Sequence, residues 1–293
     1  MLPGHAYGSV LRDRQGQWRM WYLSDPIYCG YYAQSDDGLD WHLPELGLDL
    51  QGPNGRKLPG NAYLISPQKD ICGHWLAFGQ GPEGFCVLDA ESTPHPAAKA
   101  RFTALYLSKR PGINGKDVSG LFVASSDDGI HWLSDTNNPV IHGWHDTNNM
   151  FFFDRRIGRY VLYGRPDACV SHVTHANRLI ARCESDDLVN WTPYRTVLDT
   201  DDLDADPIDT VDEAAKIADC KVDAALRTAA WQRVTEGAKV DTRELIRGRN
   251  RQWYGINVFP YADLYLGIAM MYDVPSGTMW LELIHSYNGI EWR

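Results

Sequence analysis

Short apolar or alternating runs recur along the chain, and each has the length and the aromatic and β-branched content of a β-strand. They come in sets of three. The earliest runs of the sets are AYGSVL (6–11), AYLIS (62–66), MFFF (150–153) and YGINVF (254–259). The middle runs are WRMWYL (18–23), RFTALYL (101–107), RYVLYG (159–164) and LYLGIAMMY (264–272). The last runs are YYAQ, LFVAS, LIARCE and WLELIH, so the pattern predicts four repeated units of three strands.

Each set of runs ends in the same seven-residue turn. The four copies are SDDGLDW (35–41), SDDGIHW (126–132), SDDLVNW (185–191) and SYNGIEW (286–292), with the shared pattern S-x-[DN]-[GL]-x-x-W. Asp-Gly and Asn-Gly supply the positive φ that a tight turn needs, and the Trp would begin a fourth, outer strand. Four-stranded antiparallel units repeated in this way make a β-propeller. We therefore expect residues 1–293 to form a single all-β propeller domain.

Two parts of the chain depart from the repeat. The fourth turn ends beside the last residue, Arg293, so either the N-terminal segment closes the ring or a final blade is lost; we expect five blades, the last of them partly or wholly absent. Between the third and fourth units, the acidic stretch DTDDLDADPID lacks the spacing of a calcium loop and is typical of a solvated linker. The residues that follow place apolar side chains at helical spacing. The sequence thus predicts an acidic and helical insertion between blades at 205–245.

The composition narrows the range of partners. Acidic residues outnumber basic ones by 38 to 28 and the formal charge is −10, which disfavours a nucleic-acid partner. No run reaches the roughly 18 apolar residues that span a bilayer, so no membrane partner is expected. The first residues, MLPGHAYGSV, lack the features of a signal peptide, which indicates a cytoplasmic protein if the chain is complete. Six cysteines without a CxxC pair indicate free thiols, and the oligomeric state stays open.

Three segments together resemble a known family. The S-x-D-G-x-x-W turn, the segment HDTNNMFFFD and the segment VFPYADLYLGIAMMYD resemble the five-bladed propeller glycosidases related to glycoside hydrolase families 32 and 43. The resemblance runs from about Tyr7 to Trp292, without the insertion. The related turn of sialidases has one more residue between Asp and Trp, which argues against a six-bladed sialidase. The resemblance implies a five-bladed propeller that hydrolyses a glycosidic bond of an oligo- or polysaccharide.

In such a propeller the innermost strand of each blade begins near a central funnel, so polar residues there are expected to contact the ligand. Amide and aromatic side chains suit a polyhydroxylated ligand, and we expect a carbohydrate partner. The implied substrate-binding residues are His5, Tyr7, Asn61, Tyr63, His145, Asn148, Asn149, Arg165, Tyr254 and Asn257.

Glycoside hydrolysis needs two carboxyl groups on either side of the scissile bond. Asp146 is the first candidate, because it resembles an aspartate that orients the acid and binds sugar in those families; a turn-capping role is the alternative. Glu244, upstream of the fourth inner run, and Glu83, in the Gly-rich GQGPEGFCVLD, are candidates for the second, with a surface ion pair as the alternative for Glu244. The family's nucleophilic aspartate has no counterpart, since the segment before the first inner run holds His5 and no acid.

Other chemistries find less support in the sequence. The two HxxH spacings, 142–145 and 172–175, lack the glutamate and the helical periodicity of a zinc site. No P-loop, GxSxG or dinucleotide motif is present, so we expect no metal and no cofactor. Two rival functions stay open. A non-catalytic sugar-binding propeller would lack the second carboxylate, and a phosphorolytic relative would hold phosphate with basic groups such as Arg165 and His145.

Overall fold

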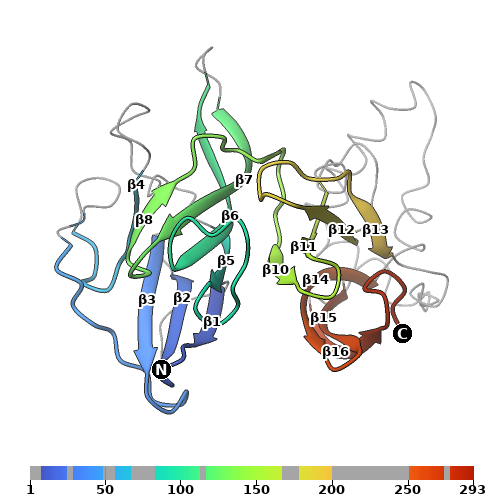
Figure 1. The fold of residues 1–293 in the computed structure, drawn as a ribbon, viewed down its shortest axis with the longest axis horizontal. Coiled ribbons are helices and arrows are strands. Elements are labelled where there is room, and N and C mark those ends of the chain that lie inside the picture. Colours follow the sequence, from blue (N-terminus) through green and yellow to red (C-terminus); the bar gives the residue numbers. More distant parts are fainter. Residues whose placement is uncertain are drawn as a thin grey trace, which may run out of the picture. The chain divides into compact units, whose positions relative to one another are not determined.

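A computed structural model of the protein describes residues 8–24, 29–48, 50, 57–66, 83–112, 117–166, 178–199, 251–273 and 278–293. All regular structure in these ranges is β-strand, as the runs predict (Figure 1). The described residues contain no helix with the length and hydropathy to cross a membrane. The insertion predicted at 205–245 lies outside them.

The chain forms two compact units. The first unit comprises Met1–Leu162 and Glu184–Thr192, and the second comprises Tyr163–Cys183 and Pro193–Arg293. The described residues form four sheets, which agrees with the four predicted repeats. A fifth blade and the joining of both units into one propeller domain stay predictions.

The first sheet is antiparallel and matches the first three predicted runs. It contains β1 (Gly8–Arg12), β2 (Trp18–Ser24) and β3 (Cys29–Ser35). Beyond the turn, Gln34 and His42 exchange two backbone hydrogen bonds of 3.0 and 2.8 Å. The Tyr32 N–H donates to the Asn61 carbonyl at 2.9 Å. The outer side of β3 is therefore covered by later chain segments.

The second sheet corrects one predicted strand. In spatial order it contains β4 (Leu64–Ser66), β8 (His131–Ser134), β7 (Asp117–Ser126), β6 (Phe102–Pro111) and β5 (Glu83–Asp89), and β9 (Ile141–His142) also pairs with β7. The run 62–66, expected to be the inner strand, instead supplies β4, which pairs in parallel with the outer strand β8. The inner strand is β5, whose beginning falls in a Gly-rich stretch that resembles a loop in sequence.

The third and fourth sheets follow the predicted runs. The third contains β10 (Met150–Asp154), β11 (Arg159–Gly164), β12 (Ile180–Ser185) and β13 (Arg195–Leu198). The fourth contains β14 (Arg251–Tyr261), β15 (Leu264–Asp273) and β16 (Thr278–Ser286). All neighbouring strands in the fourth sheet are antiparallel.

The four seven-residue turns share one hydrogen-bond pattern. In each copy the serine Oγ donates to the Asp or Asn two residues later and accepts from the N–H three residues later. The Asp or Asn Oδ1 in turn accepts two further backbone N–H groups. The fourth position has positive φ in every copy: Gly38 (80°), Gly129 (81°), Leu188 (67°) and Gly289 (71°). The repeat read from the sequence is therefore a repeat in three dimensions.

A second turn motif has no counterpart among the sequence predictions. A buried aspartate lies at the end of each innermost strand of the first three sheets or directly after it, and the three are Asp13, Asp89 and Asp154. In each case Oδ1 accepts the backbone N–H two residues later. Burial raises the pKa of Asp13, but hydrogen bonds from Arg19 and Gln17 outweigh it, so the pKa lies below its usual value.

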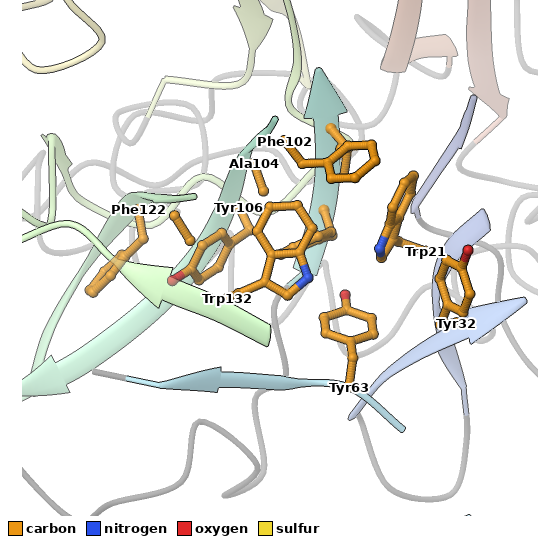
Figure 2. Packing of buried hydrophobic residues seen from close by; sticks show 11 residues of the cluster. Trp21, Tyr32, Tyr63, Phe102, Ala104, Tyr106, Phe122 and Trp132 are labelled. Carbon is orange, nitrogen blue, oxygen red and sulfur yellow. The ribbon is translucent and has the colours of Figure 1, made fainter. Parts of the chain in front are cut away.

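An aromatic cluster lies in the interior of the first unit. Figure 2 shows Trp132 near its middle, with Trp21, Tyr63 and Tyr106 around it. The cluster comprises Trp21, Tyr32, Tyr63, Phe85, Val87, Phe102, Ala104, Tyr106, Phe122, Ala124 and Trp132. The Gly129 carbonyl accepts the indole N–H groups of both Trp21 (2.6 Å) and Trp132 (3.0 Å). The second copy of the repeated turn therefore accepts hydrogen bonds from two tryptophans of the cluster, one on β2 and one on the outer strand β8.

The buried His95 predicts a pH dependence of stability. Its Nδ1 lies 2.7 Å from the Tyr160 hydroxyl, and burial lowers its pKa from the ordinary value of 6.5. Between the folded and unfolded pKa values of His95 the unfolded chain binds more protons. The contribution of neutral His95 to stability is therefore fully present above pH 6.5 and is lost as the pH falls below it. We expect the urea midpoint to decrease from pH 7.5 to about pH 5.5.

His95→Phe, which keeps a ring beside Tyr160, should reduce this decrease. His42→Phe is the matched control, because His42 is exposed in the folded state and should retain the wild-type decrease. An unchanged pH dependence in His95→Phe would assign the effect to other groups.

Candidate functional site

The inner strands β1, β5 and β10 of three successive sheets contact one another in the first unit. Ser9 Oγ on β1 donates to the Phe85 carbonyl on β5 at 3.1 Å and accepts the Val87 N–H at 2.8 Å. The Cys86 thiol on β5 donates to the Phe151 carbonyl on β10 at 3.5 Å. Burial raises the pKa of the Cys86 thiol to about 11, so it is an unreactive part of this packing. The beginnings of β5 and β10 are thereby brought close together.

The turn His145–Asn149 leads into β10 and is held by its own buried groups. The His145 carbonyl accepts the Thr147 N–H at 2.8 Å and the Asn149 Nδ2–H at 2.9 Å. The Asn149 amide also donates to the Thr147 carbonyl at 3.0 Å. The side chain of His145 donates from Nε2 to the His142 carbonyl at 3.1 Å. These bonds fix the local shape of the turn.

Exposure divides the polar residues of this turn into two groups. His145 and Asn149 are 1% and 0% exposed, so they contribute to the shape of the turn. Their side chains were predicted to contact a ligand, but they are not accessible from solvent in this structure. Asp146 is exposed and Asn148 is half-exposed. The exposed carboxylate of Asp146 therefore sits on a turn whose neighbouring residues are anchored.

The beginning of β5 packs against this turn. A Cβ at Gly84 would lie 2.8 Å from the Thr147 carbonyl oxygen and 3.1 Å from the Asn149 nitrogen, and Gly84 has a φ of 59°. Only glycine combines that conformation with such an approach. Glu83 precedes Gly84 in the chain, so its backbone is adjacent to the Asp146 turn. Two of the three predicted carboxylates are thus carried by neighbouring segments.

Replacing Gly84 with alanine should lower the free energy of unfolding by more than about 2 kcal/mol, since strain from positive φ and a steric clash add. Gly158→Ala is the control, because Gly158 has a φ of 68° and no atom within 4 Å of the added Cβ. It should cost about 1–2 kcal/mol. Urea unfolding of both variants measures the difference, and equal costs would show that the Gly84 contact is not tight.

Asn61 and Tyr63 lie elsewhere than predicted. They were expected at the beginning of an inner strand, but they flank the outer side of β3, where the Tyr63 N–H donates to the Gly30 carbonyl. The Asn61 amide donates to the Tyr32 carbonyl at 3.0 Å, and the Tyr63 ring packs 5.2 Å from Phe85. Both side chains are buried, and these contacts assign them to the interior of the first unit.

The second unit contains the remaining described candidates. Arg165, 3% exposed, donates from Nη2 to the Tyr254 carbonyl at 2.9 Å, and its guanidinium carbon lies 5.3 Å from the Tyr254 ring centroid. Asn257 is exposed and pairs with Ile268 across the fourth sheet. Arg178, half-buried beside Tyr254, was missed from the sequence because no motif marks it.

Several predicted residues lie outside the described ranges. These are His5, Tyr7, Glu244 and the second HxxH pair, and of Glu83 only the backbone is described. Within the described ranges, no group of three or more His, Cys, Asp or Glu residues is arranged to hold a metal ion.

No protein-family model and no curated protein matches this chain. Solved structures do match. A thermostable family-43 glycoside hydrolase has a TM-score of 0.52 and 12% identity, covering 99% of this chain and 72% of its own. An endo-arabinase from Bacteroides thetaiotaomicron has a TM-score of 0.50 and 9% identity, covering 98% and 77%.

The GH32 β-fructofuranosidase BmSUC1 of Bombyx mori has a TM-score of 0.50 and 11% identity, covering 100% of this chain. The chain spans 48% of that enzyme's length. At such identities the likeness concerns the fold, so the protein has the fold of the propeller glycoside hydrolases of families 43 and 32.

Proposed function

We propose that the protein hydrolyses a glycosidic bond of an oligo- or polysaccharide, with Asp146 as one of the two carboxyl groups. The observation that carries the proposal is the anchored turn at the beginning of β10, from which the Asp146 carboxylate is exposed. A carboxylate on a turn whose shape is fixed by buried hydrogen bonds meets the need of catalysis for fixed positions.

Glu83 is the preferred second carboxyl group. Its neighbour Gly84 packs against the Asp146 turn, and Glu83 itself begins β5 next to β10. Glycosidases place their two carboxyl groups roughly 5–9.5 Å apart, so the second carboxyl group must come from a segment close to the Asp146 turn. The fold shared with glycoside hydrolases supports the same assignment.

We also propose that the propeller has five blades. The outer face of the fourth sheet supports a further blade, because it exposes apolar side chains that a packed sheet would cover. Leu281 and Leu283 on β16 are exposed, and Leu283 pairs with the exposed Ile268 on β15.

A panel of aryl glycosides and of plant and microbial oligosaccharides tests the proposal. Release of a reducing sugar from at least one member, in buffer free of phosphate, is the expected result. Binding of a member without release would favour a non-catalytic carbohydrate-binding protein, and turnover that requires phosphate would favour a phosphorolytic relative. Either result would overturn hydrolysis.

A further inference from the structure

A rigidly held guanidinium lies at the beginning of β12 in the second unit. Arg178 Nη1 donates to Gln252 Oε1 at 2.7 Å, and the Trp253 N–H donates to the Arg178 carbonyl at 3.1 Å. The guanidinium carbon lies 5.7 Å from the ring centroid of Tyr254 and 5.1 Å from that of Tyr272. Backbone, amide and two aromatic rings thus fix the side chain before any ligand arrives.

The charge of Arg178 is not balanced by a carboxylate in the described part of the chain. Its hydrogen-bond partner is the neutral Gln252, and its other contacts are aromatic rings. The side chain is half-buried, so water screens its charge incompletely. A bound anion would offset the free-energy cost of partly removing this charge from water.

A second guanidinium group lies over the same ring. Arg165 also lies over Tyr254, 5.3 Å from the ring centroid, so two guanidinium groups share one aromatic side chain. The whole chain carries a formal charge of −10, so two neighbouring arginines are unusual in this protein.

We propose that Arg178 is the centre of a binding site for an oxyanion, either the carboxylate of an acidic sugar or a phosphate. A guanidinium has five N–H donors in a planar fork, and the bond to Gln252 uses one of them. The remaining donors match the two oxygens of a carboxylate or phosphate. The acidic-sugar source rests on the proposed function, whereas the phosphate source does not.

Calorimetric titration with glucuronate, glucose and inorganic phosphate at low ionic strength tests the site. At least one of the two anions should bind about tenfold more tightly than glucose, and added salt should weaken that binding. Arg178→Gln should weaken anion binding by about tenfold or more. Arg195→Gln removes the same charge from the exposed strand β13 of the same unit and should leave binding unchanged.

Binding of glucuronate alone would identify an acidic sugar as the ligand, and binding of phosphate alone would identify phosphate. Anion binding no tighter than that of glucose, or unchanged in Arg178→Gln, would overturn the proposal. Urea unfolding checks that the variant is folded; if it is not, Arg178→Lys, which keeps the charge but loses the planar fork, should still weaken binding. The titration needs no turnover, so hydrolysis and anion binding can fail independently.

Discussion

Replacing Asp146 with asparagine is expected to lower turnover of the carbohydrate substrate by at least about 100-fold. The substitution keeps the size of the side chain and removes the carboxylate that would act in general acid–base or nucleophilic catalysis. Because Asp146 is exposed and asparagine keeps the shape of the side chain and one of its oxygens, the variant should remain folded, which urea unfolding checks. Steady-state kinetics should show the loss in kcat, with KM altered much less.

The exposed Asp127 provides the control for this prediction. Asp127→Asn makes the same change in charge on the first unit, in the repeated turn after β7, and should retain wild-type turnover. Wild-type turnover in Asp146→Asn would remove Asp146 from the mechanism. An equal loss in both variants would point to a general effect of charge.

The largest expected effect on stability comes from Trp132→Ala, which should lower the free energy of unfolding by about 3–5 kcal/mol. Trp132 is 1% exposed, and its ring lies 5.0 Å from Phe85 and 6.2 Å from Trp21. Its removal would leave a cavity in the aromatic cluster and break the hydrogen bond to Gly129. Urea unfolding at equilibrium measures the change.

Trp41 occupies the same position in the first copy of the turn but is only partly buried. Trp41→Ala should therefore cost less than half as much as Trp132→Ala. If the two variants lost equal stability, the contribution of the repeated tryptophan would depend on the turn itself and not on its packing in the cluster.

Most strands could be predicted because their signals are local. Alternating or apolar runs of strand length and the Ser-x-Asp-Gly turns depend on neighbouring residues, and both recur in the structure. Leu188 is an exception to the preference of this turn position for glycine. It adopts a φ of 67° where the other copies have glycine, and its side chain is buried.

The inner strand of the second sheet could not be predicted in the same way. β5 begins at Glu83 inside a Gly-rich stretch, and its consecutive buried residues Phe85 to Leu88 lack the alternation that marks a half-exposed strand. The parallel pairing of β4 with β8 joins segments that are far apart in sequence. Such pairing depends on tertiary packing and leaves no local pattern.

The candidate site was only partly predictable for a similar reason. The polar residues before β10 indicated a functional segment, but sequence does not say whether a polar side chain faces solvent or a backbone carbonyl. Asn149 turned inward to hold the turn, whereas Asp146 is exposed. Arg178 belongs to no motif, and its environment is made by residues from β14 and β15.

We propose that the turn before β10 and the beginning of β5 form a sugar-cleaving site. A crystal structure of the Asp146→Asn variant with its oligosaccharide substrate tests it most directly. We expect a sugar ring within hydrogen-bond distance of residue 146 and the Glu83 carboxyl group roughly 5–9.5 Å from that side chain. A sugar bound away from this turn, or no second carboxyl group within that distance, would contradict it.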